Sequence, residues 1–154
     1  MTLADQEIPP RVVLGFDFGE KRIGVAVGQE LTGQARGLTT LSSKNRQPDW
    51  ESISRLIEEW RPNLLIVGRP LHMDGTEQPL THLAYRFGNR LSGRYNLPVE
   101  HVDERLSSYE AEQELSEESK IFTKSDIDKR AAEKILQSWL DNNRRLSAKI
   151  DDKL

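Results

Sequence analysis

The stretch from residue 12 to residue 28 reads VVLGFDFGEKRIGVAVG and places a polar turn between two apolar runs. Residues 12–16 and 23–27 are continuously apolar, which is typical of short strands buried on both faces of a sheet. The turn is too short for a crossover connection, so the two strands are predicted to pair as an antiparallel hairpin. The sheet is therefore expected to begin antiparallel.

Helical and strand patterns alternate along the rest of the chain. Further strands are predicted near 35–41, 64–67 and 98–102, and helices at 50–60, 80–91 and 131–140. Another helix is expected to start at Ser107, because Ser107 and Glu110 match a capping box. This order predicts one α/β domain whose sheet continues with parallel crossovers, with short flexible tails near 1–10 and 143–154.

The composition is that of an ordinary globular protein. Of the 154 residues, 36% are hydrophobic and 31% are charged, and the apolar runs are too short to span a bilayer. We expect no membrane contact, and the absence of a secretory signal makes the cytoplasm the expected location. The lack of cysteine excludes disulfides and thiolate metal sites. The net charge of −3 argues against bulk coating of nucleic acid but allows a local basic strip.

Asp17 lies at the end of an otherwise buried strand. A buried carboxylate is costly unless a cation, hydrogen-bond donors or water compensate it. One interpretation is a turn aspartate that accepts hydrogen bonds from residues 19–22 or pairs with Lys21 or Arg22. The other is a metal or phosphate site, and the residues alone leave both open.

Asp128 is predicted to face the sheet from the last helix, since it shares helical spacing with Ala132, Ile135 and Trp139. The alternative is a capping role together with Ser125 in the first turn, where the helix dipole favours a carboxylate. A carboxylate in this position can both cap the helix and bind a metal.

Asp103 and Glu104 follow the predicted strand 98–102, and ligand sites of open α/β sheets gather at such carboxyl ends. Alternation does not choose between them, because their side chains point to opposite faces and either can turn inward in a bend. A solvated loop that includes Arg105 is the alternative.

One chemistry accounts for all of these carboxylates. Hard cations such as Mg²⁺ and Mn²⁺ prefer carboxylate oxygens, and a pair of such ions can activate a water for displacement at phosphorus. Zinc is not indicated, because His72, His82 and His101 lack zinc-like spacing and are expected to be surface or loop residues.

Four motifs follow one another along the chain: residues 15–26 (GFDFGEKRIGVA), 68–76 (GRPLHMDGT), 103–108 (DERLSS) and 128–132 (DKRAA). In this order they resemble the motifs of the YqgF family, also called RuvX-like, which comprises proteins assigned to pre-16S rRNA cleavage and earlier proposed to be Holliday junction resolvases. The resemblance implies a ribonuclease H-like fold, with a mixed five-stranded sheet and helices on both faces.

The resemblance also implies an acidic site formed by Asp17, Glu104 and Asp128, with Asp103 as the rival of Glu104. These residues would hold Mg²⁺ or Mn²⁺, with two ions expected. In the implied mechanism Asp17 bridges the ions, and a bound water attacks the phosphodiester.

Basic residues near this site are candidates for holding the substrate. Lys21 or Arg22 is expected to hold the scissile phosphate, unless both are ordinary turn charges. Arg69 stands where the family often has Leu and adds a candidate phosphate contact, after Gly68, which is expected to allow close approach of a backbone. A second departure from the family pattern covers residues 116–124, where a Gly- and Lys-rich stretch is replaced.

A basic strip is predicted on the second helix. Arg86, Arg90 and Arg94 recur every four residues, and such a row suits backbone phosphates. A solvated helix face is the alternative.

The leading hypothesis is a metal-dependent nuclease that processes the 5′ end of pre-16S rRNA. We expect a monomer or a weak homodimer, because no clear dimerisation stripe is present. The second hypothesis is a Holliday junction resolvase acting on branched DNA, and a noncatalytic nucleic-acid-binding module is the third. Nucleotide handling, suggested by the Asp-x-Gly turn of actin-like ATPases, is disfavoured because the chain is too short for two lobes.

Overall fold

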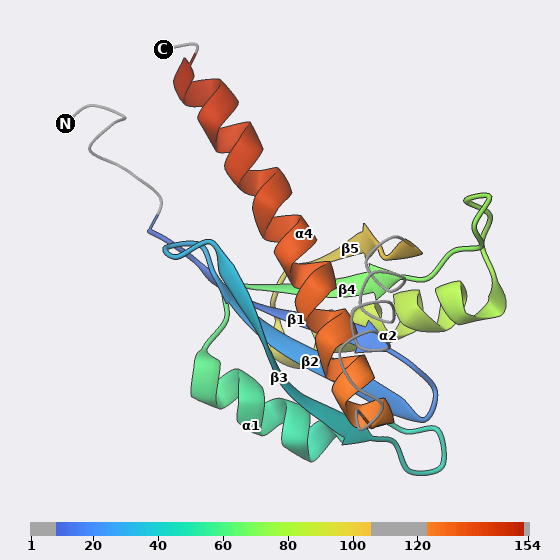
Figure 1. The fold of residues 1–154 in the computed structure, drawn as a ribbon. Coiled ribbons are helices and arrows are strands. Elements are labelled where there is room, and N and C mark those ends of the chain that lie inside the picture. Colours follow the sequence, from blue (N-terminus) through green and yellow to red (C-terminus); the bar gives the residue numbers. More distant parts are fainter. Residues whose placement is uncertain (1–8, 106–122, 153–154) are drawn as a thin grey trace.

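The computed structural model describes residues 9–105 and 123–152 of the chain (Figure 1). The elements, in chain order, are β1 (Val12–Phe18), β2 (Arg22–Gln29), β3 (Gln34–Ser42), α1 (Trp50–Trp60), β4 (Leu64–Arg69), α2 (Pro79–Tyr95), β5 (Val99–Asp103) and α4 (Lys124–Asp152). The helix predicted to start at Ser107 lies outside the described residues. In the described ranges, no helix combines the length and the apolar character that crossing a bilayer requires.

The five strands form one mixed sheet in the order β3-β2-β1-β4-β5. β2 pairs antiparallel with both β1 and β3, whereas β4 runs parallel to both β1 and β5. The predicted hairpin and the parallel crossovers are therefore confirmed. In the hairpin register Asp17 lies directly opposite Gly24, so the two residues belong to the same face of the sheet.

Helices cover both faces of the sheet (Figure 1), as predicted. Each face has its own apolar core. α1 and α2 pack on one face, over a core that includes Leu14 and Phe16. α4 crosses the other face, over a core that includes Val13 and Ile66. Alternate residues of β1 thus enter opposite cores, and Asp17, in phase with Val13, lies on the α4 face.

Three details differ from the sequence-based expectations. β1 continues through Phe18, so Asp17 lies inside the strand. α4 is helical as far as Asp152, well past its apolar stripe, because no Gly or Pro interrupts that segment. His101 lies in β5, where its ring contacts Tyr85 at a centroid distance of 4.5 Å, and is therefore not a loop residue.

The start of α4 packs so closely on β2 that the strand requires a glycine. A Cβ atom on Gly24 would overlap the carbonyl oxygen of Asp128, which is backbone and cannot rotate away. Gly24 therefore sets how deeply the start of α4 lies on the sheet.

Replacing Gly24 with Ala is expected to destabilise the protein by about 1–3 kcal/mol, because the added methyl group forces α4 away from the sheet. Urea denaturation followed by circular dichroism measures this change. Gly93→Ala is the matched control: it lies in α2 with nothing within 4 Å of an added Cβ, so it should stabilise the helix slightly. Equal effects of the two substitutions would contradict the packing argument.

Candidate active site

Asp17 projects from the central strand β1 toward α4. Its neighbours Phe16 and Phe18 pack in the opposite core, and Asp17 itself is half-buried. A carboxylate here lies at the carboxyl end of a strand whose partner β4 runs parallel to it. This end of the sheet is where open α/β sheets bind ligands.

Glu104 follows β5 directly and is almost completely buried, with 8% of its surface exposed. Gly68 at the end of β4 makes room for it, since a Cβ atom there would overlap Glu104 Oε2. The Glu104 side chain is hydrogen-bonded to Asp17. Its Oε2 atom, however, is buried without any hydrogen-bond partner. The structure thus brings two predicted acids together and leaves one of their oxygens unsatisfied.

The electrostatics of this pair favour a bound proton. Burial raises the pKa of Glu104 to about 7; the hydrogen bond with Asp17 opposes the increase, and the charge of Asp103 adds to it. Two carboxyl groups can form a hydrogen bond only if one of them carries a proton. Near neutral pH Glu104 is therefore close to the midpoint between its charged and its neutral form.

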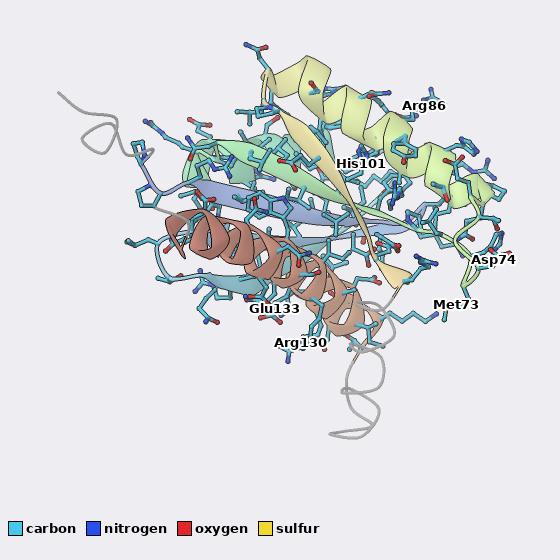
Figure 2. The ribbon with its side chains drawn as sticks, turned by 90° about the horizontal axis from the view of Figure 1, so that it is seen from above. Met73, Asp74, Arg86, His101, Arg130 and Glu133 are labelled. Carbon is cyan, nitrogen blue, oxygen red and sulfur yellow. The ribbon has the colours of Figure 1, made fainter. Side chains whose placement is uncertain are left out.

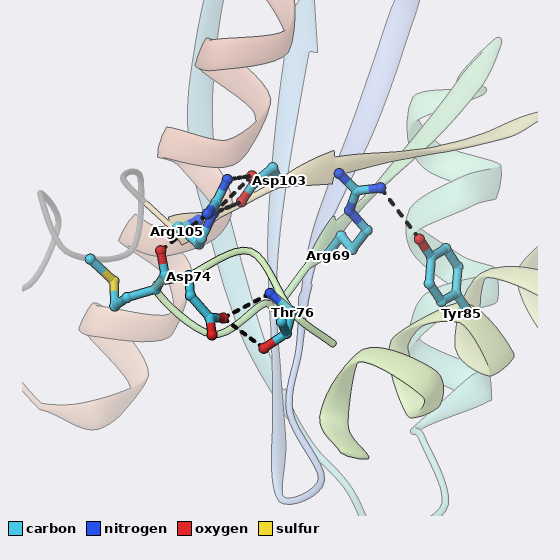
Figure 3. Close-up of polar contacts among 7 residues, drawn as sticks. Arg69, Asp74, Thr76, Tyr85, Asp103 and Arg105 are labelled. Atoms are coloured by element: carbon cyan, nitrogen blue, oxygen red, sulfur yellow. Dashed lines mark hydrogen bonds and ion pairs between the residues drawn. The ribbon is translucent and has the colours of Figure 1, made fainter. Parts of the chain in front are cut away.

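Asp103 belongs to a different set of contacts. Its carboxylate accepts hydrogen bonds from the Arg105 guanidinium, the shortest being 2.6 Å from Nη2 to Oδ2 (Figure 3). These bonds lower the pKa of Asp103. Val102 packs in the core under α4, and alternation from Val102 brings Glu104, not Asp103, to the α4 face.

Asp128 lies near the start of α4, and its carboxylate is turned to the hairpin. Oδ2 accepts a hydrogen bond of 2.6 Å from Arg22 Nε, within an ion pair. Thr123 and Asp126, not Ser125 and Asp128, cap the helix, because their side chains accept hydrogen bonds from each other's backbone N–H groups. The capping interpretation of Asp128 was therefore wrong.

Asp128 is close to the pair but is not joined to it. Its backbone carbonyl packs on Gly24, the residue opposite Asp17. Among the described residues, no three Asp, Glu or His side chains are gathered closely enough to bind one metal ion. The side chain of Asp128 is engaged by Arg22 instead.

An open hollow of about 510 Å³ lies at the tip of the hairpin. It is lined by Gly19, Glu20, Lys21, Arg22, Gln78, Pro79, Leu80 and Asp128. Lys21 and Arg22 therefore lie beside one of the predicted acids. Cationic side chains in this position can bind a phosphate next to Asp128.

Arg69 points away from the acidic pair. Its Nη1 lies 3.5 Å from the Tyr85 hydroxyl of α2 (Figure 3), and its Nε is buried without a hydrogen-bond partner. The expected close approach at Gly68 is made by the Glu104 side chain and not by a backbone. Arg69 thus contacts α2 on the face of the sheet opposite to Glu104.

The three arginines of α2 differ in their surroundings. Figure 2 shows Arg86 on the outer side of the helix, where it is exposed. Arg90 and Arg94 lie over the Trp50 ring, with their guanidinium carbons 4.9 and 4.1 Å from the ring centroid. Part of the predicted basic strip therefore packs on α1.

Two features that shape the site were not predicted from the sequence. Gly24 carried a usable signal, since a glycine inside an apolar strand often marks close approach of another backbone. The ion pair between Arg22 and Asp128 carried none, because its partners are 106 residues apart. His101 is also more buried than expected, and desolvation lowers its pKa.

Comparison with known proteins identifies the family. The RuvX family, described as Holliday junction resolvase, matches residues 11–142. A protein of Nitrosococcus oceani named "Putative pre-16S rRNA nuclease" is 57% identical over 132 residues, which cover 85% of this chain and 87% of that protein. A protein of Yersinia pestis with the same name is 50% identical over 133 residues, covering 85% and 95%.

Solved structures share the fold at low sequence identity. RuvC of T. thermophilus in complex with a Holliday junction substrate has a TM-score of 0.50 at 17% identity, covering 86% of this chain and 95% of that one. Fowlpox virus resolvase in complex with Holliday junction DNA has a TM-score of 0.51 at 14% identity, covering 85% and 97%. These likenesses support the ribonuclease H-like fold.

The mixed five-stranded sheet, whose fold is shared with these resolvases, defines a ribonuclease H-like protein. The chain belongs to the RuvX family. It is thus a member of a nuclease family, a class of hydrolases that cleave phosphodiester bonds. The resemblance drawn from the four motifs is confirmed.

Replacing Glu104 with Gln is expected to stabilise the free protein at alkaline pH. The pKa of about 7 in the folded state lies above the ordinary 4.5, so between these values the native state holds a proton that the unfolded state releases. This contribution to stability is lost as the pH rises through 7. In urea denaturation the variant should exceed the wild type by roughly 3 kcal/mol at pH 8.5, with a smaller difference at pH 5.

Glu58→Gln is the control, because Glu58 is exposed on α1 and forms no ion pair with a described residue. This substitution should leave the pH dependence unchanged. A difference between Glu104→Gln and the wild type that is the same at both pH values would contradict the assigned protonation of Glu104.

Proposed function

We propose that this chain is a metal-dependent nuclease that cleaves the 5′ end of pre-16S rRNA during ribosome assembly. Relatives with 57% and 50% identity carry pre-16S rRNA in their names and match most of the chain. The observation that carries the proposal is the buried pair of Asp17 and Glu104, with Oε2 lacking a partner. With a substrate of this kind, we propose a cytoplasmic location.

The donor set fits Mg²⁺ or Mn²⁺. Asp17 and Glu104 offer carboxylate oxygens, the ligands that hard cations prefer. A divalent cation would replace the shared proton and supply the partner that Glu104 Oε2 lacks. Asp128 would complete the site if its carboxylate released Arg22 and bound the cation instead. Two such ions, when bound, activate a water and stabilise the leaving oxygen at phosphorus.

The remaining contributions come from the protein itself. Burial under α4 keeps bulk water away from Glu104, which strengthens its interaction with a cation. Arg22, once released from Asp128, and Lys21 would bind the scissile phosphate in the hollow at the hairpin tip. Arg86 and Arg90 would hold the adjoining part of the strand, whereas Arg69 is directed to Tyr85.

Cleavage of Holliday junctions is the second candidate. The family description names this activity, and the fold is shared with two resolvases that were solved with such a substrate. Symmetric cutting of a junction requires two active sites, and therefore two copies of the chain. The monomer or weak homodimer that we propose suits a single cut in RNA.

The Asp17→Asn and Glu104→Gln variants are expected to lose cleavage of a precursor 16S RNA by about 100-fold or more, because each removes a metal-binding charge. Asp103→Asn should retain most of the activity, since its carboxylate binds Arg105. The assay uses purified protein with Mg²⁺ or Mn²⁺ and includes a four-way DNA junction as competing substrate.

Asp141→Asn is the matched control, an exposed aspartate on α4. Full activity of Asp17→Asn would place the chemistry elsewhere. Faster cleavage of the junction than of the RNA would favour the resolvase, and binding without cleavage in either metal would favour the noncatalytic module.

Replacing Arg22 with Ala is expected to raise the affinity for Mn²⁺ in the absence of RNA, because Asp128 loses its competing cation. The same variant should cleave more slowly, since it lacks a phosphate contact. Calorimetric titration with Mn²⁺ and the RNA assay measure the two effects. Arg55→Ala, an exposed arginine of α1, should change neither. Weaker Mn²⁺ binding by Arg22→Ala would refute the exchange of partners at Asp128.

A further inference from the structure

A second pocket lies on the other side of the hairpin tip, between the loop that follows β3 and the helix α2. Its volume is about 360 Å³. It is lined by Phe18, Glu20, Asn45, Arg46, Gln47, Pro48, Leu83, Arg86, Phe87 and Arg90. None of the predicted acids lines this pocket, so it is distinct from the candidate active site.

The floor of the pocket is apolar and firmly supported. Phe18 and Leu83 are partly exposed there, so their side chains remain available for contact. Phe18 stacks on the buried ring of Phe87 at a centroid distance of 5.0 Å and an interplanar angle of 30°. An apolar floor of this kind suits the flat, weakly polar face of a nucleobase.

The rim of the pocket is basic. Arg46, Arg86 and Arg90 line it, and Glu20 is the only acid among the described residues that do so. Three guanidinium groups around one cavity favour an anion, and a phosphate can accept several of their N–H donors at once.

Part of this rim is already fixed in the free protein. Arg90 lies over Trp50 and donates a hydrogen bond of 3.1 Å from Nη2 to Gln47 Oε1. The loop carrying Arg46 is closed by two backbone hydrogen bonds between Lys44 and Gln47, of 2.9 and 3.0 Å. Arg46 itself has a φ of 62°, a left-handed conformation that non-glycine residues seldom adopt. Asn45 has a φ of 51° as well, and a two-residue hairpin turn of type I′ requires positive φ at both central residues. This turn fixes the point at which Arg46 leaves the backbone.

The pocket continues the surface of the candidate active site. Glu20 lines both this pocket and the hollow that contains Lys21, Arg22 and Asp128. A strand with a phosphate in the hollow can therefore cross the hairpin tip and enter the pocket directly.

We propose that this pocket binds one nucleotide of a single-stranded segment next to the cleavage point. Arg46, Arg86 and Arg90 hold its phosphate, and its base lies against Phe18 and Leu83. The segment is single-stranded because a paired base would first have to be unpaired and unstacked before it could reach the apolar floor, whereas an unpaired base can do so directly. This inference rests on the proposed nuclease function and extends it to the substrate strand.

The test is binding of a fluorescein-labelled hexauridylate RNA, measured by fluorescence anisotropy in EDTA so that no cleavage occurs. Arg86→Glu should weaken binding by about tenfold or more and flatten the salt dependence by about 0.7 in slope for each lost phosphate contact. Arg94→Glu is the matched control: it makes the same charge change on the same helix, and its side chain packs on Trp50 outside the pocket. It should weaken binding by about twofold or less. Thermal melts establish that both variants are folded.

Photocrosslinking locates the base. A hexamer containing 4-thiouridine should crosslink to peptides that contain Phe18 or Leu83. Two results would contradict nucleotide binding in this pocket: equal weakening of RNA binding by Arg86→Glu and Arg94→Glu, or crosslinks confined to other peptides. Either result would leave the proposed cleavage of pre-16S RNA standing. Absence of cleavage by the wild type, with the contrast between the two variants preserved, would instead overturn the proposed function.

Discussion

The burial of Glu104 beside Asp17 is the constraint on which the site depends. A carboxyl group with 8% exposure would normally be excluded from such a position. It is accommodated because Gly68 leaves room for it and because Asp17 shares a hydrogen bond with it. The remaining oxygen has no partner within the described part of the chain. This arrangement costs stability in the free protein and creates a place in which a cation is favourable.

The two faces of the sheet carry different parts of the site. The α4 face carries the acids, since Asp17 and Glu104 both point to it and α4 brings Asp128 against Gly24. The opposite face, under α1 and α2, carries the basic pocket with Phe18 as its floor. Asp17 and Phe18 are consecutive in β1, so strand alternation alone places the carboxylate and the aromatic floor of the basic pocket on either side of one strand.

Much of this arrangement could be predicted from the sequence, because it depends on local patterns. The apolar runs of the hairpin and the helical stripe of α4 predicted the layers correctly, and the four motifs predicted the family. The residue pattern alone could not choose between Asp103 and Glu104, since the choice depends on Val102 packing under α4. Only the family resemblance favoured Glu104. The partner of Asp128 could not be predicted from the sequence either, because Arg22 reaches Asp128 only once α4 lies on β2. Long-range packing sets both features.

The central claim is that a divalent cation takes the place of the proton shared by Asp17 and Glu104. Calorimetric titration with Mn²⁺ in several buffers of different ionisation enthalpy counts the protons released on binding. Because the pKa of Glu104 is about 7, binding should release close to one more proton per protein at pH 6 than at pH 8.5. Binding at pH 6 without proton release would contradict the account.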